Sequence, residues 1–261
     1  MSLMHKPSFL PPVSIIISVV GYQQLPKYLV DSLRLLDYPK SKLSLVLIKN
    51  ELQGIKLLRI GVRVDYINIR GSVGYGQAAN LGVKISKGNY ILLINPDIKL
   101  DKMLLKRMMN YLLNFPRVGV VGPKIMSLTS PEKISRQDLP GINFNFRWGK
   151  FAPVKPSTID HLKDAKIVDW VSGCVMLFSK LTWQTNGGFD ERYFLYFEDA
   201  DFCWRLKQRG LKTVILPQAK AYHQGSMSLG EINPLRIYYL TKSSRLFLAG
   251  HSGLPGQIRF S

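Results

Sequence analysis

Acidic residues gather in one short part of a strongly basic chain. Five of its 17 aspartates and glutamates lie within residues 187–201, although the formal net charge of the 261 residues is +19. Three of the five, Glu198, Asp199 and Asp201, follow an aromatic run at residues 193–197. Carboxylates beside apolar aromatic side chains suit proton abstraction or metal binding. These residues alone do not decide between proton abstraction and metal binding.

The sequence predicts a helix that begins near Glu198 and continues to about Arg209, with Gly210 ending it. Carboxylates in the first turn of a helix often do no more than interact with the helix dipole. The same dipole favours their ionised form near neutral pH, which suits a general base or a metal ligand. Both interpretations of Glu198 and Asp199 remain open from these residues alone.

A second acidic position, Asp97, follows directly after a predicted strand in the segment Asn95-Pro96-Asp97. These residue types also form ordinary turns. An aspartate at the carboxyl end of a strand is well placed to hold a divalent cation, because such cations prefer oxygen ligands and bridge phosphate oxygens. His223, one of four histidines, precedes a glycine and is a candidate ligand, although a lone histidine is more often structural.

A glycine-rich segment at residues 71–76 follows a predicted strand and opens a predicted helix that contains Asn80. Glycines such as Gly74 let backbone N–H groups approach a ligand, and a helix N-terminus favours an anion. The spacing differs from the G-x-G-x-x-G pattern, and the segment follows the third strand instead of the first. A dinucleotide-dependent oxidoreductase is therefore disfavoured.

Alternating strands and helices must position these residues. The predicted strands are residues 13–20, 43–48, 63–69, 90–94, 118–122 and 213–216, and the predicted helices are residues 25–36, 77–86 and 101–113. This alternation predicts an α/β fold with a mostly parallel central sheet and helices on both faces. Ligands bind such sheets beyond the carboxyl ends of the strands. Residues 127–167, which contain four prolines, interrupt the alternation and are expected to form a long irregular excursion over the site.

The composition of the chain limits the compartment in which the protein works and the partners that it can bind. The two cysteines, Cys174 and Cys203, lack zinc-type spacing and are expected to be buried free thiols in a reducing compartment. No apolar run approaches the roughly 18 residues that a membrane span needs. From Pro234 onward apolar and basic residues mix, so a helix there either lies on an anionic bilayer or packs one face on the domain. Nucleic acid is not expected as a partner, because no binding motif for it occurs.

Taken in order, these residues resemble family 2 glycosyltransferases, and especially the bacterial rhamnosyltransferase-like branch. The resemblance runs from about residue 13 to residue 228. It is carried by the opening strand and turn at 13–23, the glycine segment with Asn80, the Asn-Pro-Asp form of a D-x-D motif at 95–97, the acceptor-side segment at 168–174, the Gly-Gly-Phe-Asp-Glu…Phe-Glu-Asp-x-Asp pattern within 187–205, and His223.

The resemblance implies a GT-A (nucleotide-diphospho-sugar transferase) fold over residues 1–228 and inverting transfer from a nucleotide sugar. Asp97 and His223 would hold Mg2+ or Mn2+ on the diphosphate. Asp199 would deprotonate the acceptor hydroxyl, with Glu198 supporting the site. The basic segment at 229–261 would belong to the same domain or associate with a membrane.

It also implies further binding residues. The donor side would comprise Val20, Gly21, Tyr22, Asn50, Gly74, Asn80, Asn95 and Pro96, and the acceptor or donor sugar would face Asp169, Trp170 and Gly173. The expected role is transfer of a sugar, favoured by the branch to be rhamnose, to a glycan or lipid-linked glycan acceptor in bacterial surface polysaccharide synthesis. The expected location is the cytoplasm, with the inner face of the cytoplasmic membrane as a peripheral site.

Two departures lie on the nucleotide side of the pattern. Lys49, followed by Asn50, stands where the family usually has an aspartate that helps to read the base, and Gly21-Tyr22-Gln23 replaces the usual Thr/Ser-Tyr-Asn. The catalytic side is intact, which favours altered donor preference. The alternative is a non-catalytic relative that binds a glycan or a membrane. Asp190 and Glu191 are expected to shape the turn, and Asp201 to point away from the site.

Overall fold

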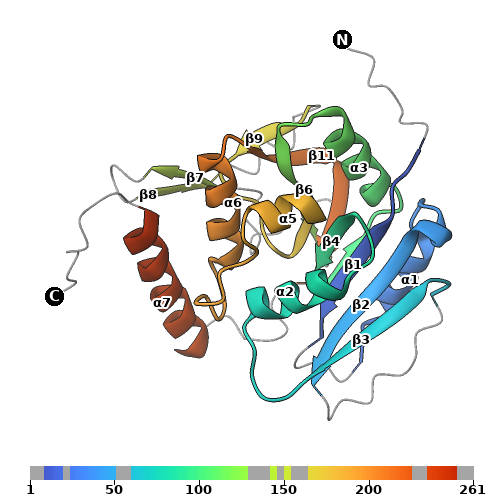
Figure 1. The fold of residues 1–261 in the computed structure, drawn as a ribbon, viewed down its shortest axis with the longest axis horizontal. Coiled ribbons are helices and arrows are strands. Elements are labelled where there is room, and N and C mark those ends of the chain that lie inside the picture. Colours follow the sequence, from blue (N-terminus) through green and yellow to red (C-terminus); the bar gives the residue numbers. More distant parts are fainter. Residues whose placement is uncertain are drawn as a thin grey trace.

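The computed structural model describes residues 9–19, 24–50, 60–128, 142–145, 150–153, 164–224 and 234–251. Its centre is one mixed sheet with strand order β3-β2-β1-β4-β10-β6-β11-β5, to which β9 adds beside β11 (Figure 1). The strands are β1 (Val13–Ser18), β2 (Leu43–Asn50), β3 (Arg63–Ile69), β4 (Tyr90–Ile94), β5 (Ile98–Leu100), β6 (Val118–Ser127), β9 (Lys166–Val168), β10 (Val175–Ser179) and β11 (Lys212–His223).

The first half of the sheet is parallel, as the sequence predicts. β1 pairs in parallel with both β2 and β4, and β2 with β3. Ile15, Ile16 and Ile17 of β1 are all buried, because helices cover both faces of these strands. The second half is mixed: β10 is antiparallel to β4 and β6, whereas β11 is parallel to β6. The parallel arrangement therefore does not extend across the whole sheet.

β11 is much longer than the predicted strand 213–216. It continues past Pro217 because a register shift between Leu216 and Lys220 accommodates the proline, which cannot donate to the ladder. The extension then pairs antiparallel with β5, so that His223 lies opposite Ile98. This continuation carries His223 next to the turn after β4.

Helices cover both faces of the sheet (Figure 1). One face carries α1 (Lys27–Leu35) and α3 (Leu104–Asn114), and the other carries α2 (Tyr75–Ile85), α5 (Lys180–Thr185) and α6 (Glu198–Gln208). α3 buries Leu104, Leu105, Met108, Met109 and Leu112. This is the spacing of an amphipathic helix that faces a core. The two cores on either side fix the strand ends that form the site.

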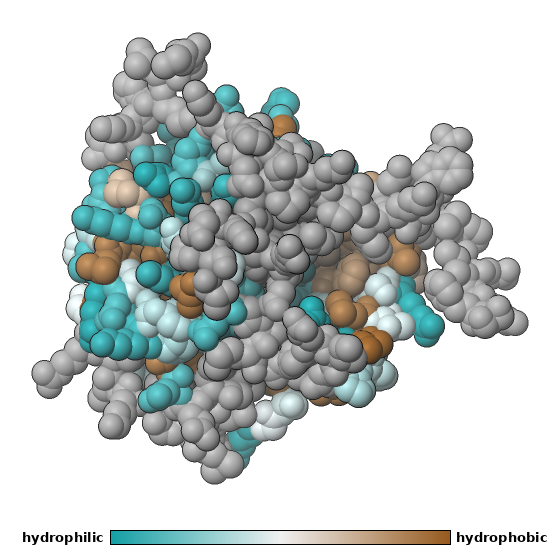
Figure 2. Space-filling model, turned by 180° about the vertical axis from the view of Figure 1, so that it is seen from behind, coloured by the Kyte–Doolittle hydropathy of each residue, from teal (hydrophilic) through white to brown (hydrophobic). Residues whose placement is uncertain are grey.

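The last described helix, α7 (Pro234–His251), packs beside the start of α6. Its buried residues are Ser243 and Phe247, and Phe247 contacts Phe144 of strand β7 (Ile142–Asn145) with ring centroids 5.0 Å apart. Figure 2 shows apolar and hydrophilic residues next to one another on the side of the molecule that carries α7. Within the described ranges, no helix is both long and apolar enough to cross a membrane.

Part of the expected irregular excursion is regular. β7 and β8 (Lys150–Pro153) form an antiparallel hairpin, and β9 pairs with β11. The prediction of irregular structure is therefore wrong for these strands. Phe144 explains part of the difference, since its ring packs on both Trp204 and Phe247, partners that lie far along the chain.

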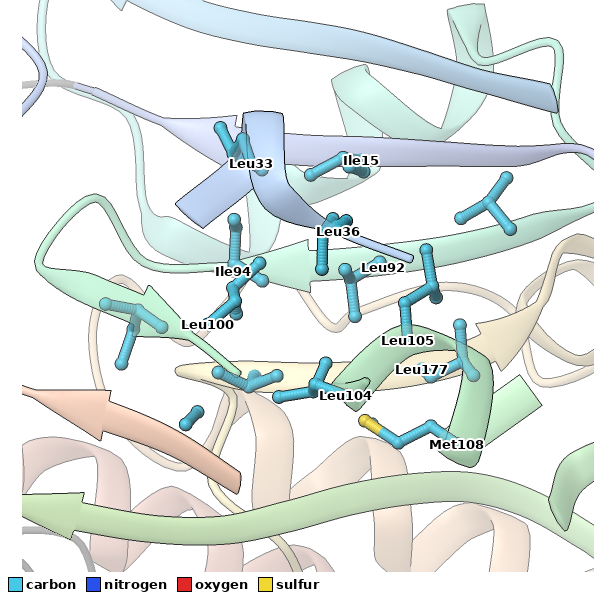
Figure 3. Close-up of a cluster of buried hydrophobic side chains, with 14 of the residues drawn as sticks. Ile15, Leu33, Leu36, Leu92, Ile94, Leu100, Leu104, Leu105, Met108 and Leu177 are labelled. Carbon is cyan, nitrogen blue, oxygen red and sulfur yellow. The ribbon is translucent and has the colours of Figure 1, made fainter. Parts of the chain in front are cut away.

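The core under α1 and α3 is made of aliphatic side chains from the sheet and both helices (Figure 3). Leu33 and Leu36 enter this core from α1 and its C-terminal end, near Ile15 and Leu92, whereas Leu105 and Met108 enter it from α3. Cys174 and Cys203 are both buried and are not joined in a disulfide, as expected from the sequence.

Candidate active site

Four chain segments meet at one edge of the sheet. They are the turn after β4, the segment before β10, the end of β11 and the start of α6. The Asn95 N–H donates to the Cys174 carbonyl at 2.9 Å, which joins the first two segments. The Gln224 N–H donates to the Asp97 carbonyl at 3.2 Å, which joins the third. The antiparallel pairing of β10 and β11 with β4 and β5 creates this meeting point.

Asp97 and His223 form the first candidate pair. Asp97 Oδ2 and His223 Nε2 are 3.1 Å apart, and both side chains are buried. Pro96 is buried in the same turn and Asn95 is half-buried. Among the described residues, neither Asp97 Oδ1 nor Asn95 Oδ1 has a hydrogen-bond partner. Buried oxygens without a partner are costly, and a bound cation would satisfy them.

These donors fit a hard divalent cation. A carboxylate oxygen and an imidazole nitrogen are ligands that Mn2+ accepts, and Mg2+ favours the carboxylate. Within the described ranges, no cluster of three or more histidine, cysteine, aspartate or glutamate side chains is placed to hold a metal. Asp97 and His223 would therefore leave most coordination positions to substrate oxygens and water, which is how Mg2+ is commonly bound.

Asp199 is held by backbone N–H groups at the start of α6. Its Oδ2 accepts from Gly173 at 2.6 Å, and its Oδ1 accepts from Ala200 at 2.8 Å. A side chain at Gly173 would obstruct this contact, because its Cβ would lie 3.1 Å from Asp199 Oδ2. Gly173 directly precedes Cys174, whose carbonyl binds Asn95, so Asp199 is joined to the Asp97 turn through two residues.

Burial sets the acidity of the paired carboxyls. It raises the pKa of Glu198 well above its usual value, and neighbouring Asp199 raises that pKa further. Burial also raises the pKa of Asp199, against the backbone N–H groups of Gly173 and Ala200, which favour the charged form. Glu198 Oε2 has no hydrogen-bond partner among the described residues. Raised carboxyl pKa values bring a general base closer to neutral pH.

Tyr75 is a site residue that the sequence reasoning missed. Its hydroxyl donates to the Gly173 carbonyl at 2.8 Å, so Gly173 is held between Tyr75 and Asp199. Burial raises the pKa of Tyr75 well above its usual value, and the charges of Glu198, Asp199 and Asp97 add to the effect. The phenol thus lies close enough to all three acids for their charges to act on it. Its place as the first residue of α2, directly after Gly74, was the available signal.

Gly74 and Asn80 have structural partners. A Cβ at Gly74 would lie 2.7 Å from the Phe194 carbonyl oxygen, so the glycine permits a close approach of two chain segments. The Asn80 amide donates to the Phe189 carbonyl and to Glu191 Oε1, and its oxygen accepts from the Phe189 N–H and the Trp183 indole. This arrangement favours a role for Asn80 in holding the acidic segment instead of in binding a ligand.

Asp169 also has partners within the protein. Its carboxylate accepts from the Phe144 N–H at 2.8 Å and pairs with Lys207 at 2.5 Å. Trp170 is half-buried and contacts both the core under α6 and the cluster around Phe247. Asp169 therefore connects the β7–β8 hairpin to α6. Trp170 lies between the core under α6 and the cluster around Phe247.

The remaining acids of the cluster turn away from the site. Asp190 forms an ion pair with exposed Arg192, and Asp201 pairs with Arg205 at 2.7 Å and with His251 at 2.7 Å. The expectation that Asp201 points elsewhere is confirmed by these contacts. Its charge is used to connect α6 with α7.

The predicted nucleotide side is only partly described. Val20, Gly21 and Tyr22 lie outside the described residues, and of Asn50 the structure describes the backbone alone. Lys49 is half-buried on β2, and its ammonium group lies 6.0 Å from the centre of the Tyr66 ring. The donor-side assignments at these positions stay predictions.

The architecture is that of the GT-A class of glycosyltransferases. A similar solved structure is that of GalNAc-T7 with UDP, GalNAc and Mn2+, with a TM-score of 0.64 and 18% identity. The match covers 83% of this chain and 44% of that one, so the chain spans less than half of the GalNAc-T7 structure. The predicted GT-A fold is confirmed.

The chain belongs to glycosyltransferase-like family 2, whose sequence profile matches residues 11–236. It is 28% identical over 213 residues to N-acetylglucosaminyl-diphospho-decaprenol L-rhamnosyltransferase of Mycobacterium tuberculosis, covering 72% of this chain and 69% of that protein. It is 29% identical over 171 residues to the rhamnosyltransferase WbbL of Escherichia coli, covering 61% of this chain and 64% of that protein. The family resemblance expected from the motifs is confirmed.

Proposed function

We propose that the protein is an inverting, metal-dependent glycosyltransferase that uses a nucleotide-diphosphate sugar. The observation that carries the proposal is the joining of Asp199 to the Asp97–His223 pair through Gly173 and Cys174. One carboxylate with a raised pKa thus lies at the same sheet edge as two cation ligands. A base and a diphosphate site on one edge are what single-displacement glycosyl transfer requires.

In this mechanism Asp199 accepts the proton of the acceptor hydroxyl. The resulting oxygen nucleophile attacks the anomeric carbon from the side opposite the diphosphate, and a new glycosidic bond forms. The bond to the diphosphate breaks, its electron pair leaves with the nucleotide, and the anomeric configuration inverts. A divalent cation on Asp97 and His223 would offset the negative charge that develops on the leaving diphosphate.

The contacts of Asp199 suit this role. Two N–H donors fix its carboxylate, so its orientation is set before the acceptor arrives. Tyr75 fixes Gly173 in turn and so supports the same geometry from α2. Glu198 is a second buried carboxyl beside Asp199, and burial together with the charge of Asp199 raises the pKa of Glu198.

The donor sugar is proposed to be rhamnose and the acceptor a glycan or lipid-linked glycan of a bacterial surface polysaccharide. The mycobacterial and Escherichia coli relatives, both named as rhamnosyltransferases, support this choice. The lysine at position 49, where the family usually has an aspartate that helps to read the base, supports a different donor base. The same residue also motivates the alternative of a non-catalytic glycan-binding relative.

The outer face of α7 is proposed to rest on the cytoplasmic face of a membrane. The apolar side chains of Leu235, Ile237 and Tyr238 are half or more exposed, and Lys242 and Arg245 are exposed on the same helix. Residues 234–251 include no aspartate or glutamate, so this surface is suited to anionic lipid. A lipid-linked acceptor would then lie close to the site.

The proposal is tested with a panel of nucleotide sugars, each with Mn2+, with Mg2+ or with EDTA. We expect one donor to raise the unfolding temperature in a metal-dependent way and to be hydrolysed or transferred. Asp199→Asn should keep the stabilisation but lose turnover by roughly 10²–10⁴-fold, the usual range for a general base. Donor stabilisation without turnover in the unmodified protein would favour the non-catalytic alternative. If no donor gives either stabilisation or turnover, the proposed nucleotide-sugar site is refuted.

A further inference from the structure

The turn that presents Glu198 and Asp199 is held in an unfavourable backbone conformation. Tyr196 and Phe197, the two residues before α6, both have φ of 68°. Left-handed conformations are unfavourable for residues with a Cβ and persist only where neighbours enforce them. Phe197 is also the N-cap of α6 and makes no side-chain capping bond. The turn therefore depends on contacts from elsewhere in the fold.

α2 supplies one support. The Tyr75 N–H donates to the Phe194 carbonyl at 2.9 Å, and Gly74 leaves room for this approach. This contact lies at the first residue of the turn. α2 also approaches the first residue of α6, where a Cβ added at Gly76 would lie 3.3 Å from the Glu198 Cβ.

α7 supplies the second support through residues spaced four apart, here called the α7 stripe: Tyr239, Ser243, Phe247 and His251. Tyr239 stacks on Phe194 with ring centroids 4.9 Å apart, and the Ser243 hydroxyl donates to the Leu195 carbonyl at 2.8 Å. Phe247 packs on Phe197 at 5.5 Å, and His251 Nε2 lies 2.7 Å from Asp201 Oδ1.

The order of these contacts follows the chain. Residues four apart lie on one face of a helix, so the α7 stripe is a continuous line along α7. It runs alongside residues 194–201. Its first member meets the start of the turn, and its last member meets Asp201 in the first turn of α6. Ser243 and Phe247, which are the buried residues of α7, lie opposite the middle of the turn.

We propose that α7 is a clamp that positions the catalytic carboxylates, with the α7 stripe as a set of positioning residues for Asp199 and Glu198. The proposal extends the proposed function, because it assigns the stripe a role in the same reaction. Releasing the stripe lets Tyr196 and Phe197 leave the left-handed region, which displaces the first turn of α6. Such displacement lowers kcat more than it raises KM for the donor, since the metal ligands lie on β11 and the β4–β5 turn.

The test uses hydrogen exchange on the full chain without substrate, together with steady-state kinetics. The informative changes are Ser243→Ala and Phe247→Ala. Their controls are Thr241→Ala, an exposed position on the same helix, and Phe247→Leu, which keeps an apolar side chain. We expect amides of residues 194–201 to exchange at least tenfold faster in both alanine variants, with less change in Phe247→Leu and none in Thr241→Ala. We expect kcat to fall about tenfold with donor KM within twofold.

Unchanged exchange in residues 194–201 of a folded Ser243→Ala variant would overturn the clamp, whatever the activity. If Phe247→Ala does not fold, Ser243→Ala and His251→Gln decide the question, because both remove one polar contact and little volume. The exchange measurement needs no turnover, so it separates the two proposals. Faster exchange in the stripe variants of a protein that transfers no sugar would retain the clamp and reject the proposed function. Normal exchange in the stripe variants of an active enzyme would reject the clamp and retain the proposed function.

Discussion

The Gly173 N–H donates to Asp199 Oδ2 at 2.6 Å, and the lack of a side chain at Gly173 is what allows this contact. The same glycine accepts a hydrogen bond from Tyr75. One residue thus connects α2, the segment before β10 and the start of α6. The proposed base is oriented by backbone atoms whose own position is fixed from two sides.

Gly173→Ala should impair the reaction while leaving the fold intact. The added Cβ would lie 3.1 Å from both Cβ and Oδ2 of Asp199, so the carboxylate must move by a few tenths of an ångström. Small displacements of reacting groups are expensive, and we expect kcat to fall by roughly tenfold or more. Gly250→Ala is the control, because its Cβ meets nothing within 4 Å. Equal kcat in both variants would show that Asp199 does not require this contact.

Removing either proposed cation ligand should weaken metal binding. Asp97→Asn and His223→Ala each delete one of the two proposed protein ligands, and we expect Mn2+ affinity in the presence of nucleoside diphosphate to fall at least tenfold. Calorimetric titration with MnCl2 measures this. Asp190→Asn is the matched control, since that carboxylate pairs with exposed Arg192. Unchanged Mn2+ affinity in the Asp97 variant would place the cation elsewhere.

Activity should depend on a carboxyl with a raised pKa. Burial raises the pKa of Asp199 above its ordinary 3.8. As pH is lowered, the base therefore becomes protonated at a pH above the usual carboxyl range, and kcat/KM falls there. Glu198 and Asp199 titrate as a coupled pair, and the profile reports values for the pair. The measurement is kcat/KM against pH at saturating metal. An acid limb at the ordinary value would contradict a buried base.

Glu198→Gln should make the protein less sensitive to rising pH. Because the folded-state pKa of Glu198 is raised, the folded protein binds more protons than the unfolded chain between the two pKa values. The free energy of unfolding therefore falls as pH rises through that interval, and the neutral glutamine avoids this loss. The unfolding temperatures of both proteins, measured from acidic to alkaline pH, test this difference. Each kcal/mol in the free energy of unfolding corresponds to about 2–4 °C in the unfolding temperature. Parallel curves would disprove the effect.

Charge on α7 should govern lipid binding. Each basic residue near an anionic surface contributes about 1 kcal/mol, so Lys242→Gln combined with Arg245→Gln should weaken vesicle binding by roughly tenfold or more. Co-sedimentation with vesicles of rising phosphatidylserine content measures it. The control is Lys84→Gln with Lys87→Gln, two exposed positions at and just beyond the end of α2. Binding that ignores anionic lipid content would reject the membrane proposal.

Local patterns were sufficient for the strands of the parallel half of the sheet, for helices such as α3 and for the identity of the acids. The apolar run of β1 and the spacing of α3 require burial on two faces and on one face, whatever the partners are. The acid cluster and Asn95-Pro96-Asp97 could be found because carboxylates are rare in this chain. The sequence by itself thus determined the class of fold and the chemical groups available at the site.

Tertiary structure decided how those groups divide into roles. Asn80 has a fully bonded amide, Asp169 pairs with Lys207, and Tyr75 enters the site without any motif of its own. These assignments depend on contacts between residues roughly 25 to 110 positions apart, which no local pattern contains. The same holds for α7: its composition left open whether it packs on the domain or on a membrane. Only its packing showed that one stripe lies along the turn before Asp199, while the opposite surface stays exposed.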